Sequence, residues 1–141
     1  MKIEGRCHCG AIQYEAEVDP ATVSICHCSD CQTLSGAPYR ASVPARDDDF
    51  TLTHGTPRIY VKTAESGNKR AQAFCGECGT SIYSSEVGDK PAFYMLRVGP
   101  IRQREQLPPV KQIWRNSAMP WSGDIMGVES HPRGVPMPKA P

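Results

Sequence analysis

The feature that most constrains this chain is the segment Cys26-His27-Cys28-Ser29-Asp30-Cys31, which brings three thiols within reach of one metal ion. No further cysteine lies nearby in the sequence. Zinc in proteins takes four ligands and accepts thiolates readily, and a site with only three protein ligands leaves one position for water or substrate. That open position is what distinguishes catalytic zinc from structural zinc. We therefore expect Cys26, Cys28 and Cys31 to form an open zinc site.

The other four cysteines form two short pairs, Cys7-x-Cys9 and Cys75-x-x-Cys78, and a glycine follows each pair directly. Glycine permits the left-handed turn with which the backbone folds back over a metal. Seven cysteines in this grouping fit a disulfide framework badly, but they divide readily into four plus three. We expect the two pairs to complete one closed zinc site, whose binding free energy contributes directly to folding.

The charge of the chain excludes some classes of partner. Sixteen Lys and Arg residues against fifteen Asp and Glu residues give a net charge of +1. This balance creates no field that would hold a polyanion, so neither nucleic acid nor a membrane surface is an expected partner. The sequence has no apolar run that could serve as a signal peptide or a transmembrane helix. Because grouped, unpaired cysteines are typical of a reducing compartment, we expect a cytoplasmic protein.

The pattern outside the cysteines predicts a mainly β protein. Apolar residues alternate with polar ones from Ile12 to Val18, which indicates a strand with one buried face. Ser29 is placed to cap a short helix over residues 30–35, which Gly36 would end. Turn residues separate further short strands at 39–43, 50–53, 58–62, 70–74, 82–83, 92–98 and 110–114. We expect one zinc-binding domain over residues 1–128 and a proline-rich tail over residues 129–141.

The ordered cysteine set resembles the glutathione-dependent formaldehyde-activating enzyme and centromere protein V family. The resemblance covers most of the chain, includes Ser35-Gly36-Ala37-Pro38 and Phe74-Cys75-Gly76-Glu77-Cys78-Gly79, and extends more loosely to 117–121. It implies a β-tent, Mss-four-like fold of short, coiled antiparallel sheets around zinc, with at most one or two short helices. It also implies a structural zinc on Cys7, Cys9, Cys75 and Cys78 and a catalytic zinc on Cys26, Cys28 and Cys31.

The activity implied by the resemblance is a carbon–sulfur lyase or synthase reaction on a thiol adduct. The adduct joins glutathione, the expected co-substrate, to formaldehyde or a related aldehyde. Zinc suits this chemistry because it lowers the pKa of a bound thiol or water. The residues alone leave two alternatives open, a zinc-built binding module without turnover and a thiol redox or iron–sulfur protein. They also leave open whether the chain is a monomer or a homodimer.

Few side chains outside the cysteines can be assigned a role from the sequence. His27, between two predicted ligands, is the candidate catalytic residue as a proton shuttle, although its ring can equally point away from the metal. We weigh packing against the body above lining a pocket for the two tryptophans, Trp114 and Trp121. The carboxylates of glutathione need cationic partners, for which charge alone nominates Arg40, Lys69, Arg70, Lys111 and Arg115.

Overall fold

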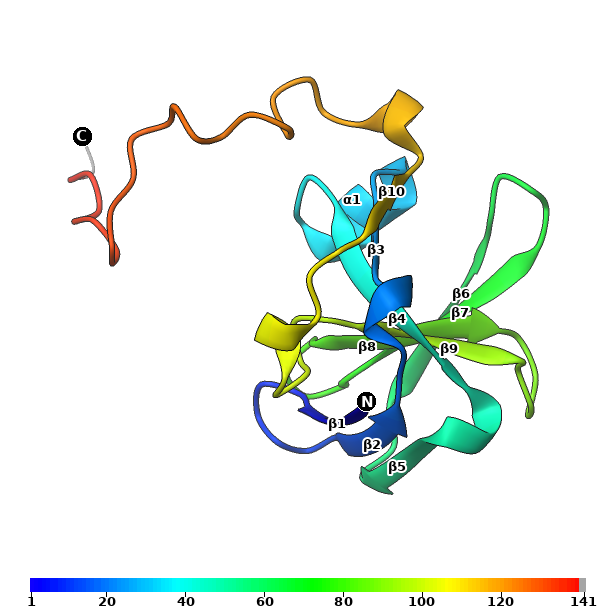
Figure 1. The fold of residues 1–141 in the computed structure, drawn as a ribbon. Helices are drawn as coiled ribbons and strands as arrows, with labels where there is room; N and C mark the ends of the chain where they lie inside the picture. The colour runs from blue at the N-terminus through cyan, green and yellow to red at the C-terminus, as the bar shows by residue number, and fades with distance from the viewer. Residues whose placement is uncertain (140–141) are drawn as a thin grey trace.

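A computed structural model describes residues 1–139, which form ten strands, one α-helix and four short 3₁₀ turns (Figure 1). This confirms the mainly β fold predicted from the sequence. Residues 140–141, the end of the predicted tail, lie outside the described part. The strands are β1 (Lys2–Arg6), β2 (Gln13–Glu17), β3 (Ser24–Cys26), β4 (Arg40–Arg46), β5 (Phe50–His54), β6 (Arg58–Thr63), β7 (Lys69–Phe74), β8 (Ser81–Glu86), β9 (Phe93–Arg97) and β10 (Lys111–Ile113), and the helix is α1 (Ser29–Ser35).

The strands form two sheets. The small sheet has the order β1-β2-β5 and is antiparallel throughout. The large sheet has the order β10-β3-β4-β9-β8-β7-β6, and its neighbours are antiparallel except for the parallel pair β10 and β3. Figure 1 shows the small sheet below the large one, with α1 at the far end of β3 and β4.

The core lies between the two sheets. Buried and exposed residues alternate strictly along β1 and β2, so each of these strands presents one apolar face. From these faces Ile3 and Tyr14 join Val43, Ile82 and Leu96 of the large sheet in one buried cluster. Burying a side chain of this size contributes about 1.5–3 kcal/mol, so this cluster is a main source of the stability of the fold.

Glycine allows one unusually close contact in the small sheet. Gly5 lies directly opposite Tyr14 in the β1–β2 register, and a Cβ atom at Gly5 would overlap the phenol ring of Tyr14. The ring therefore covers the space that a larger residue at position 5 would fill.

The start of α1 differs from the prediction. The helix begins at Ser29, and its N-cap is Cys28, whose Sγ accepts a hydrogen bond of 3.3 Å from the backbone N–H of Cys31. The predicted cap, Ser29, was wrong because the thiol of the preceding residue already satisfies this donor. Gly36 ends the helix as predicted, with a left-handed φ of 63°.

Residues 118–139 contain neither helix nor strand, and most of their side chains are exposed. Figure 1 shows this segment leading away from the two sheets. The boundary predicted between residues 128 and 129 stays a prediction. In the part of the chain that the structure describes, no helix has both the length and the apolar character needed to span a membrane.

Candidate metal centres

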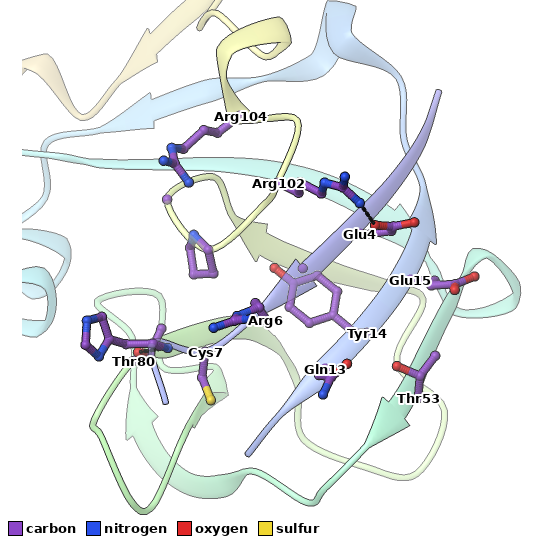
Figure 2. Close-up of a pocket in the computed structure, with 14 residues that line it drawn as sticks. Glu4, Arg6, Cys7, Gln13, Tyr14, Glu15, Thr53, Thr80, Arg102 and Arg104 are labelled. Carbon is purple, nitrogen blue, oxygen red and sulfur yellow. Dashed lines mark hydrogen bonds and ion pairs between the residues drawn. The ribbon is translucent and has the colours of Figure 1, made fainter. Parts of the chain in front are cut away.

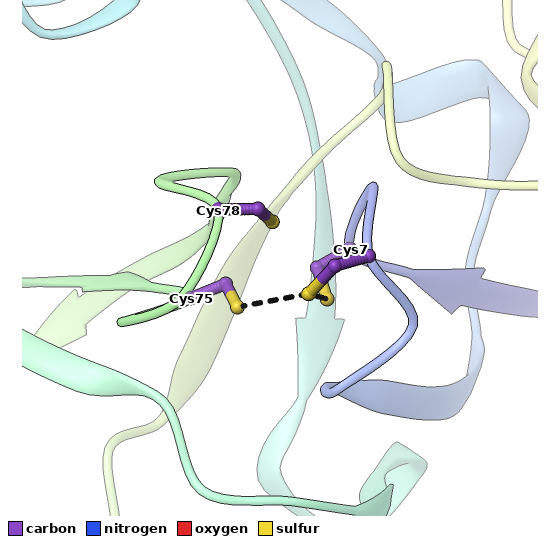
Figure 3. A group of neighbouring side chains, drawn as sticks. Cys7, Cys75 and Cys78 are labelled. Atoms are coloured by element: carbon purple, nitrogen blue, oxygen red, sulfur yellow. Dashed lines mark hydrogen bonds between the residues drawn. The ribbon is translucent and has the colours of Figure 1, made fainter.

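Two turns from distant parts of the chain bring Cys7, Cys9, Cys75 and Cys78 together (Figure 3). All four Sγ atoms lie within 4.8 Å of one another, with 3.6 Å between Cys7 and Cys9 and 3.8 Å between Cys9 and Cys75. These separations are too long for a disulfide, whose sulfurs are about 2.05 Å apart. They match the edge of about 3.8 Å in a tetrahedron of sulfurs placed about 2.3 Å from zinc. The four thiols therefore fit a closed tetrahedral zinc site.

Both turns are closed by the same kind of backbone hydrogen bond. The N–H of Gly10 donates to the carbonyl oxygen of Cys7 at 3.1 Å, and the N–H of Gly79 donates to that of Cys75 at 2.9 Å. Gly10 and Gly79 have φ values of 84° and 75°, which residues with a Cβ adopt only with strain. The glycine after each cysteine pair thus reverses the chain so that both thiols of the pair face the same point.

The other three cysteines meet where β3 ends and α1 begins. The Sγ atoms of Cys26, Cys28 and Cys31 also lie within 4.8 Å of one another. The contact between the sulfurs of Cys26 and Cys31 lowers the pKa of Cys31 and raises the pKa of Cys26, and the positive charge of Arg40 lowers the pKa of Cys31 further. Cys31 therefore loses its proton before Cys26 and becomes a thiolate, the form that binds metal. Three soft sulfur donors in this arrangement fit a zinc ion with one open position.

A cavity of about 600 Å³ opens over these three thiols. Its walls come from β3, α1, β4, the β6–β7 hairpin, β8, β9 and β10, and from Trp114. On one side, Lys62 of the hairpin forms an ion pair with Asp30 of α1. By contrast, the four-cysteine group contributes none of its thiols to this cavity. Among the described residues, the three-cysteine group is therefore the one that a small molecule in this cavity can reach.

Two arginines in this cavity are buried. Arg97 is 5% exposed and donates to Oγ of Ser42 at 2.7 Å and to Oε1 of Gln72 at 3.2 Å. Arg40 is 8% exposed. Within residues 1–139 neither guanidinium forms an ion pair with a carboxylate, and Nε of both and Nη1 of Arg40 have no hydrogen-bond partner. Burial, together with the nearby charge of Arg40, lowers the pKa of Arg97 to about 9, so Arg97 is still cationic at neutral pH.

The cavity contains only some of the cations that the sequence nominates. Arg40 and Arg70 line it, whereas Lys69, Lys111 and Arg115 do not. Arg97 and Lys62 line it and were missed. The signal for Arg97 was a charged residue near the end of the apolar run 92–98, a position where a guanidinium needs a specific partner. The sequence favoured packing over lining a pocket for the two tryptophans, but Trp114 lines the cavity. Trp121 is exposed.

His27 lies beside the three thiols in sequence, but its ring turns away from the cavity. The side chain is 1% exposed, and Nε2 lies 2.9 Å from Oε1 of Gln112. The ring of Tyr39 packs edge-on against it, with 5.4 Å between the ring centroids. His27 is not among the residues that line the cavity. Its role as a proton shuttle stays a prediction, and this geometry favours a role in joining β3 to β10.

A second cavity, of about 770 Å³, is lined by residues of β1 and β2 (Figure 2). Cys7, Gly99, Pro100, Arg102 and Arg104 also line it, and none of the three open thiols does. Its two acidic side chains are already paired, Glu4 with Arg102 at 2.9 Å and Glu15 with Lys2 at 3.2 Å. The larger cavity is therefore separate from the candidate reactive site.

Comparison with known proteins agrees with the cysteine pattern. A family model described as the glutathione-dependent formaldehyde-activating enzyme matches residues 2–117. A Halomonas elongata protein named for the same enzyme is 28% identical over 87 residues, which are 59% of this chain and 55% of the relative. An uncharacterized lyase of Schizosaccharomyces pombe is 28% identical over 98 residues, which are 65% of this chain and 64% of the relative. The match thus spans less than two thirds of either relative.

The fold also has a relative among solved structures. A crystal structure of a Rhodobacter sphaeroides protein superposes with a TM-score of 0.60 and 23% sequence identity. The match covers 77% of this chain and 98% of that one. At this identity the likeness concerns the fold alone.

Proposed function

The chain belongs to the glutathione-dependent formaldehyde-activating enzyme family, and we propose that it is a zinc-dependent carbon–sulfur lyase acting on the adduct of a small thiol and an aldehyde. The names of the two relatives support lyase chemistry, and the family description supports glutathione as the thiol. The observation that carries the proposal is the group Cys26, Cys28 and Cys31 facing a cavity of about 600 Å³.

The proposal gives the two cysteine groups different roles. Cys7, Cys9, Cys75 and Cys78 would hold a structural zinc, because four thiolates complete its tetrahedron and join residues 66 or more positions apart in the sequence. Cys26, Cys28 and Cys31 would hold the catalytic zinc. When bound there, zinc would supply a Lewis acid with one open position and lower the pKa of a thiol in that position.

The proposed reaction cleaves the adduct into an aldehyde and a thiol. In the lyase direction the hydroxyl group of the adduct loses its proton to solvent, the carbon–sulfur bond breaks, and the bonding electron pair stays on sulfur. The products are an aldehyde and a thiolate. The charges of Arg40 and Arg97 stabilise this thiolate, since a fixed cation in a partly dehydrated cavity acts more strongly than in water.

His27 acts in this proposal as a positioning residue. Its backbone N–H donates to the carbonyl oxygen of Ile113 at 3.1 Å, and its own carbonyl oxygen accepts from Nε2 of Gln32 at 2.7 Å. These bonds and the contact with Gln112 fix the backbone between Cys26 and Cys28. A substitution of His27 removes the contact with Gln112 and the packing against Tyr39 but leaves the two backbone bonds, and we expect its effect to be on the spacing of the thiols.

Two alternatives remain, a zinc-built binding module and a thiol redox protein. All residues named here come from one chain, so the proposal applies to a monomer and to a homodimer alike. The seven free thiols suit a reducing compartment such as the cytoplasm.

The test combines elemental analysis with an assay of formaldehyde release from S-hydroxymethylglutathione, measured against the spontaneous rate. We expect one to two zinc ions per chain and a rate above the spontaneous one. Release at the spontaneous rate by fully zinc-loaded protein would favour the binding module. Iron in place of zinc, or a reversible disulfide among Cys26, Cys28 and Cys31, would favour redox chemistry.

A further inference from the structure

The floor of the three-cysteine cavity holds more positive charge than the protein itself balances. Arg40 and Arg97 are both buried and both line the cavity, yet neither has a carboxylate partner among the described residues. Three of their nitrogen atoms also lack a hydrogen-bond partner. Burying a charge or a donor without a partner costs free energy. Such groups in a cavity therefore indicate that a ligand pairs with the charge and accepts the free hydrogen bonds.

The thiols alone do not account for this charge. Three thiolates around a divalent ion carry one negative charge in total, which is less than the charge of the two guanidiniums. The carboxylate of Asp30 is already paired with Lys62. The remaining acid that lines the cavity, Glu65, is exposed at its rim. A substrate thiolate on the metal would add a second negative charge, but sulfur is a weak hydrogen-bond acceptor. The unpartnered N–H groups of Arg40 and Arg97 therefore still need an oxygen acceptor from a molecule outside the protein.

The register of the large sheet puts this charge beside the reactive thiols. Arg40 lies opposite Cys26 in the β3–β4 pair, and Arg97 lies opposite Ser42 in the β4–β9 pair. Residues directly opposite one another in a sheet have Cβ atoms about 4.5–5.5 Å apart. Ser42 and Gln72 hold the Arg97 guanidinium in place. An anionic group bound by these two arginines would thus belong to the same molecule as the sulfur that enters the site.

We propose that Arg40 and Arg97 form a carboxylate subsite, so that the substrate is an anionic adduct, with a carboxylate on its thiol half or on its carbonyl half. A carboxylate fits because it offers two oxygens with about four acceptor positions and pairs strongly with guanidinium groups. The inference rests on the proposed function for the chemistry at sulfur. The binding of the carboxylate can be tested without that chemistry.

The first experiment measures binding by calorimetry on the zinc-loaded protein with two probes that carry no free thiol. S-methylglutathione keeps both carboxylates, and its diethyl ester has neither. We expect the ester to bind with an affinity lower by about tenfold or more. We expect Arg40→Gln and Arg97→Gln to lower the affinity for S-methylglutathione by about ten- to a hundredfold. Arg102→Gln is the matched control, because Arg102 is exposed, pairs with Glu4 and lines the other cavity.

Folding does not obscure this test. If either Gln variant loses zinc or the circular dichroism spectrum of the folded protein, the comparison of acid and ester on the unchanged protein still tests the carboxylate subsite. Arg97→Lys is a second variant that retains the positive charge. Equal binding of acid and ester by the unchanged protein would mean that Arg40 and Arg97 serve only as counter-ions of the thiolates. That result would overturn the proposal.

The second experiment identifies which half carries the carboxylate. Adducts of glutathione or 2-mercaptoethanol with formaldehyde or glyoxylate are compared as substrates. If the subsite binds a carboxylate of the thiol half, both glutathione adducts should be good substrates. If it binds a carboxylate of the carbonyl half, both glyoxylate adducts should be good substrates. In either case the adduct of 2-mercaptoethanol and formaldehyde should be poor, and equal rates for all four would overturn the subsite. No acceleration of any adduct, with arginine-dependent binding of S-methylglutathione intact, would refute the lyase and leave the subsite standing.

Discussion

Lys62 and Asp30 form an ion pair that joins the β6–β7 hairpin to the first turn of α1, beside the open thiols. The two residues are 32 positions apart in the sequence, and both line the reactive cavity. Since Asp30 directly precedes the predicted ligand Cys31, this contact links the wall of the cavity to its metal-binding floor. The hairpin also carries Arg70, a further cation that lines the cavity.

We predict that Lys62→Met weakens binding of S-methylglutathione several-fold while zinc content stays unchanged, because the cavity wall loses its link to α1. The loss of stability should be small, up to about 1 kcal/mol, since Asp30 is 46% exposed and solvent screens the pair. Calorimetry and denaturant unfolding measure the two effects. Lys69→Met is the control, because Lys69 begins β7 on the same hairpin but lies outside the cavity. Equal effects of the two substitutions would show that the ion pair has no special role.

Gly5→Ala should destabilise the protein by about 1–3 kcal/mol, because the added Cβ would overlap the ring of Tyr14 in the packed core. Gly99→Ala is the matched control. Gly99 is near the same region, has no positive φ, and a Cβ there would meet no atom within 4 Å. Thermal or denaturant unfolding of both variants measures the difference. Indistinguishable stabilities would mean that β1 moves aside without cost.

Tyr14→Phe should leave stability at pH 7 unchanged or slightly higher, since the Tyr14 hydroxyl is buried without a hydrogen-bond partner. Burial also raises the pKa of Tyr14 above its ordinary value of about 10. Above pH 10 the folded state therefore retains a proton that the unfolded chain releases. The contribution of Tyr14 to the free energy of unfolding is at its full value below pH 10 and falls as the pH rises above 10. The variant should lose less stability than the unchanged protein between pH 10 and pH 12.

Denaturant unfolding at pH 7 and at pH 11 tests this prediction. Tyr60→Phe provides the matched control, because it removes the hydroxyl of an exposed tyrosine in place of a buried one. A clear loss of stability in Tyr14→Phe at pH 7 would mean that the hydroxyl has a partner such as an ordered water.

The sequence predicted best where a structure depends on neighbours along the chain. The spacing of the cysteines, the alternation from Ile12 to Val18 and the stop at Gly36 are local, and each has its expected structural counterpart. Strand β1 was missed because glycine and charged residues dilute its pattern, and it is stabilised by pairing with β2. Strand β3 was missed because it is only three residues long and ends within the cysteine motif.

The side chains around the thiols depend instead on contacts between distant segments. Arg97 becomes part of the site through the pairing of β9 with β4, which no local pattern encodes. The burial of the His27 ring similarly depends on Gln112, 85 residues away. The assignment of the seven cysteines to structural and catalytic zinc stays a prediction, and comparing two cysteine substitutions tests it most directly.

We predict opposite outcomes for Cys78→Ala and Cys28→Ala. Cys78→Ala removes a thiol from the group that joins the N-terminal turn to the turn after β7, so the variant should be insoluble or unfolded. Cys28→Ala leaves that group intact, so it should fold, retain about one zinc ion per chain, and lose thiol binding and lyase activity. Soluble yield, zinc content and circular dichroism measure the difference.

Cys28 also caps α1, so its substitution needs a control that separates the helix from the metal. Cys28→Ser retains a good N-cap, whereas Cys28→Ala removes the acceptor for the Cys31 N–H and should cost about 1 kcal/mol more. Because a hydroxyl is a poor substitute for a thiolate on zinc, both variants should lose the second zinc ion and thiol binding equally. A serine variant that regains full thiol binding would show that the cap, and not coordination, explains the effect. If Cys28→Ala binds thiols normally while losing as much stability as Cys78→Ala, the ligands have been divided wrongly, and Cys26, Cys28 and Cys31 are not the reactive group.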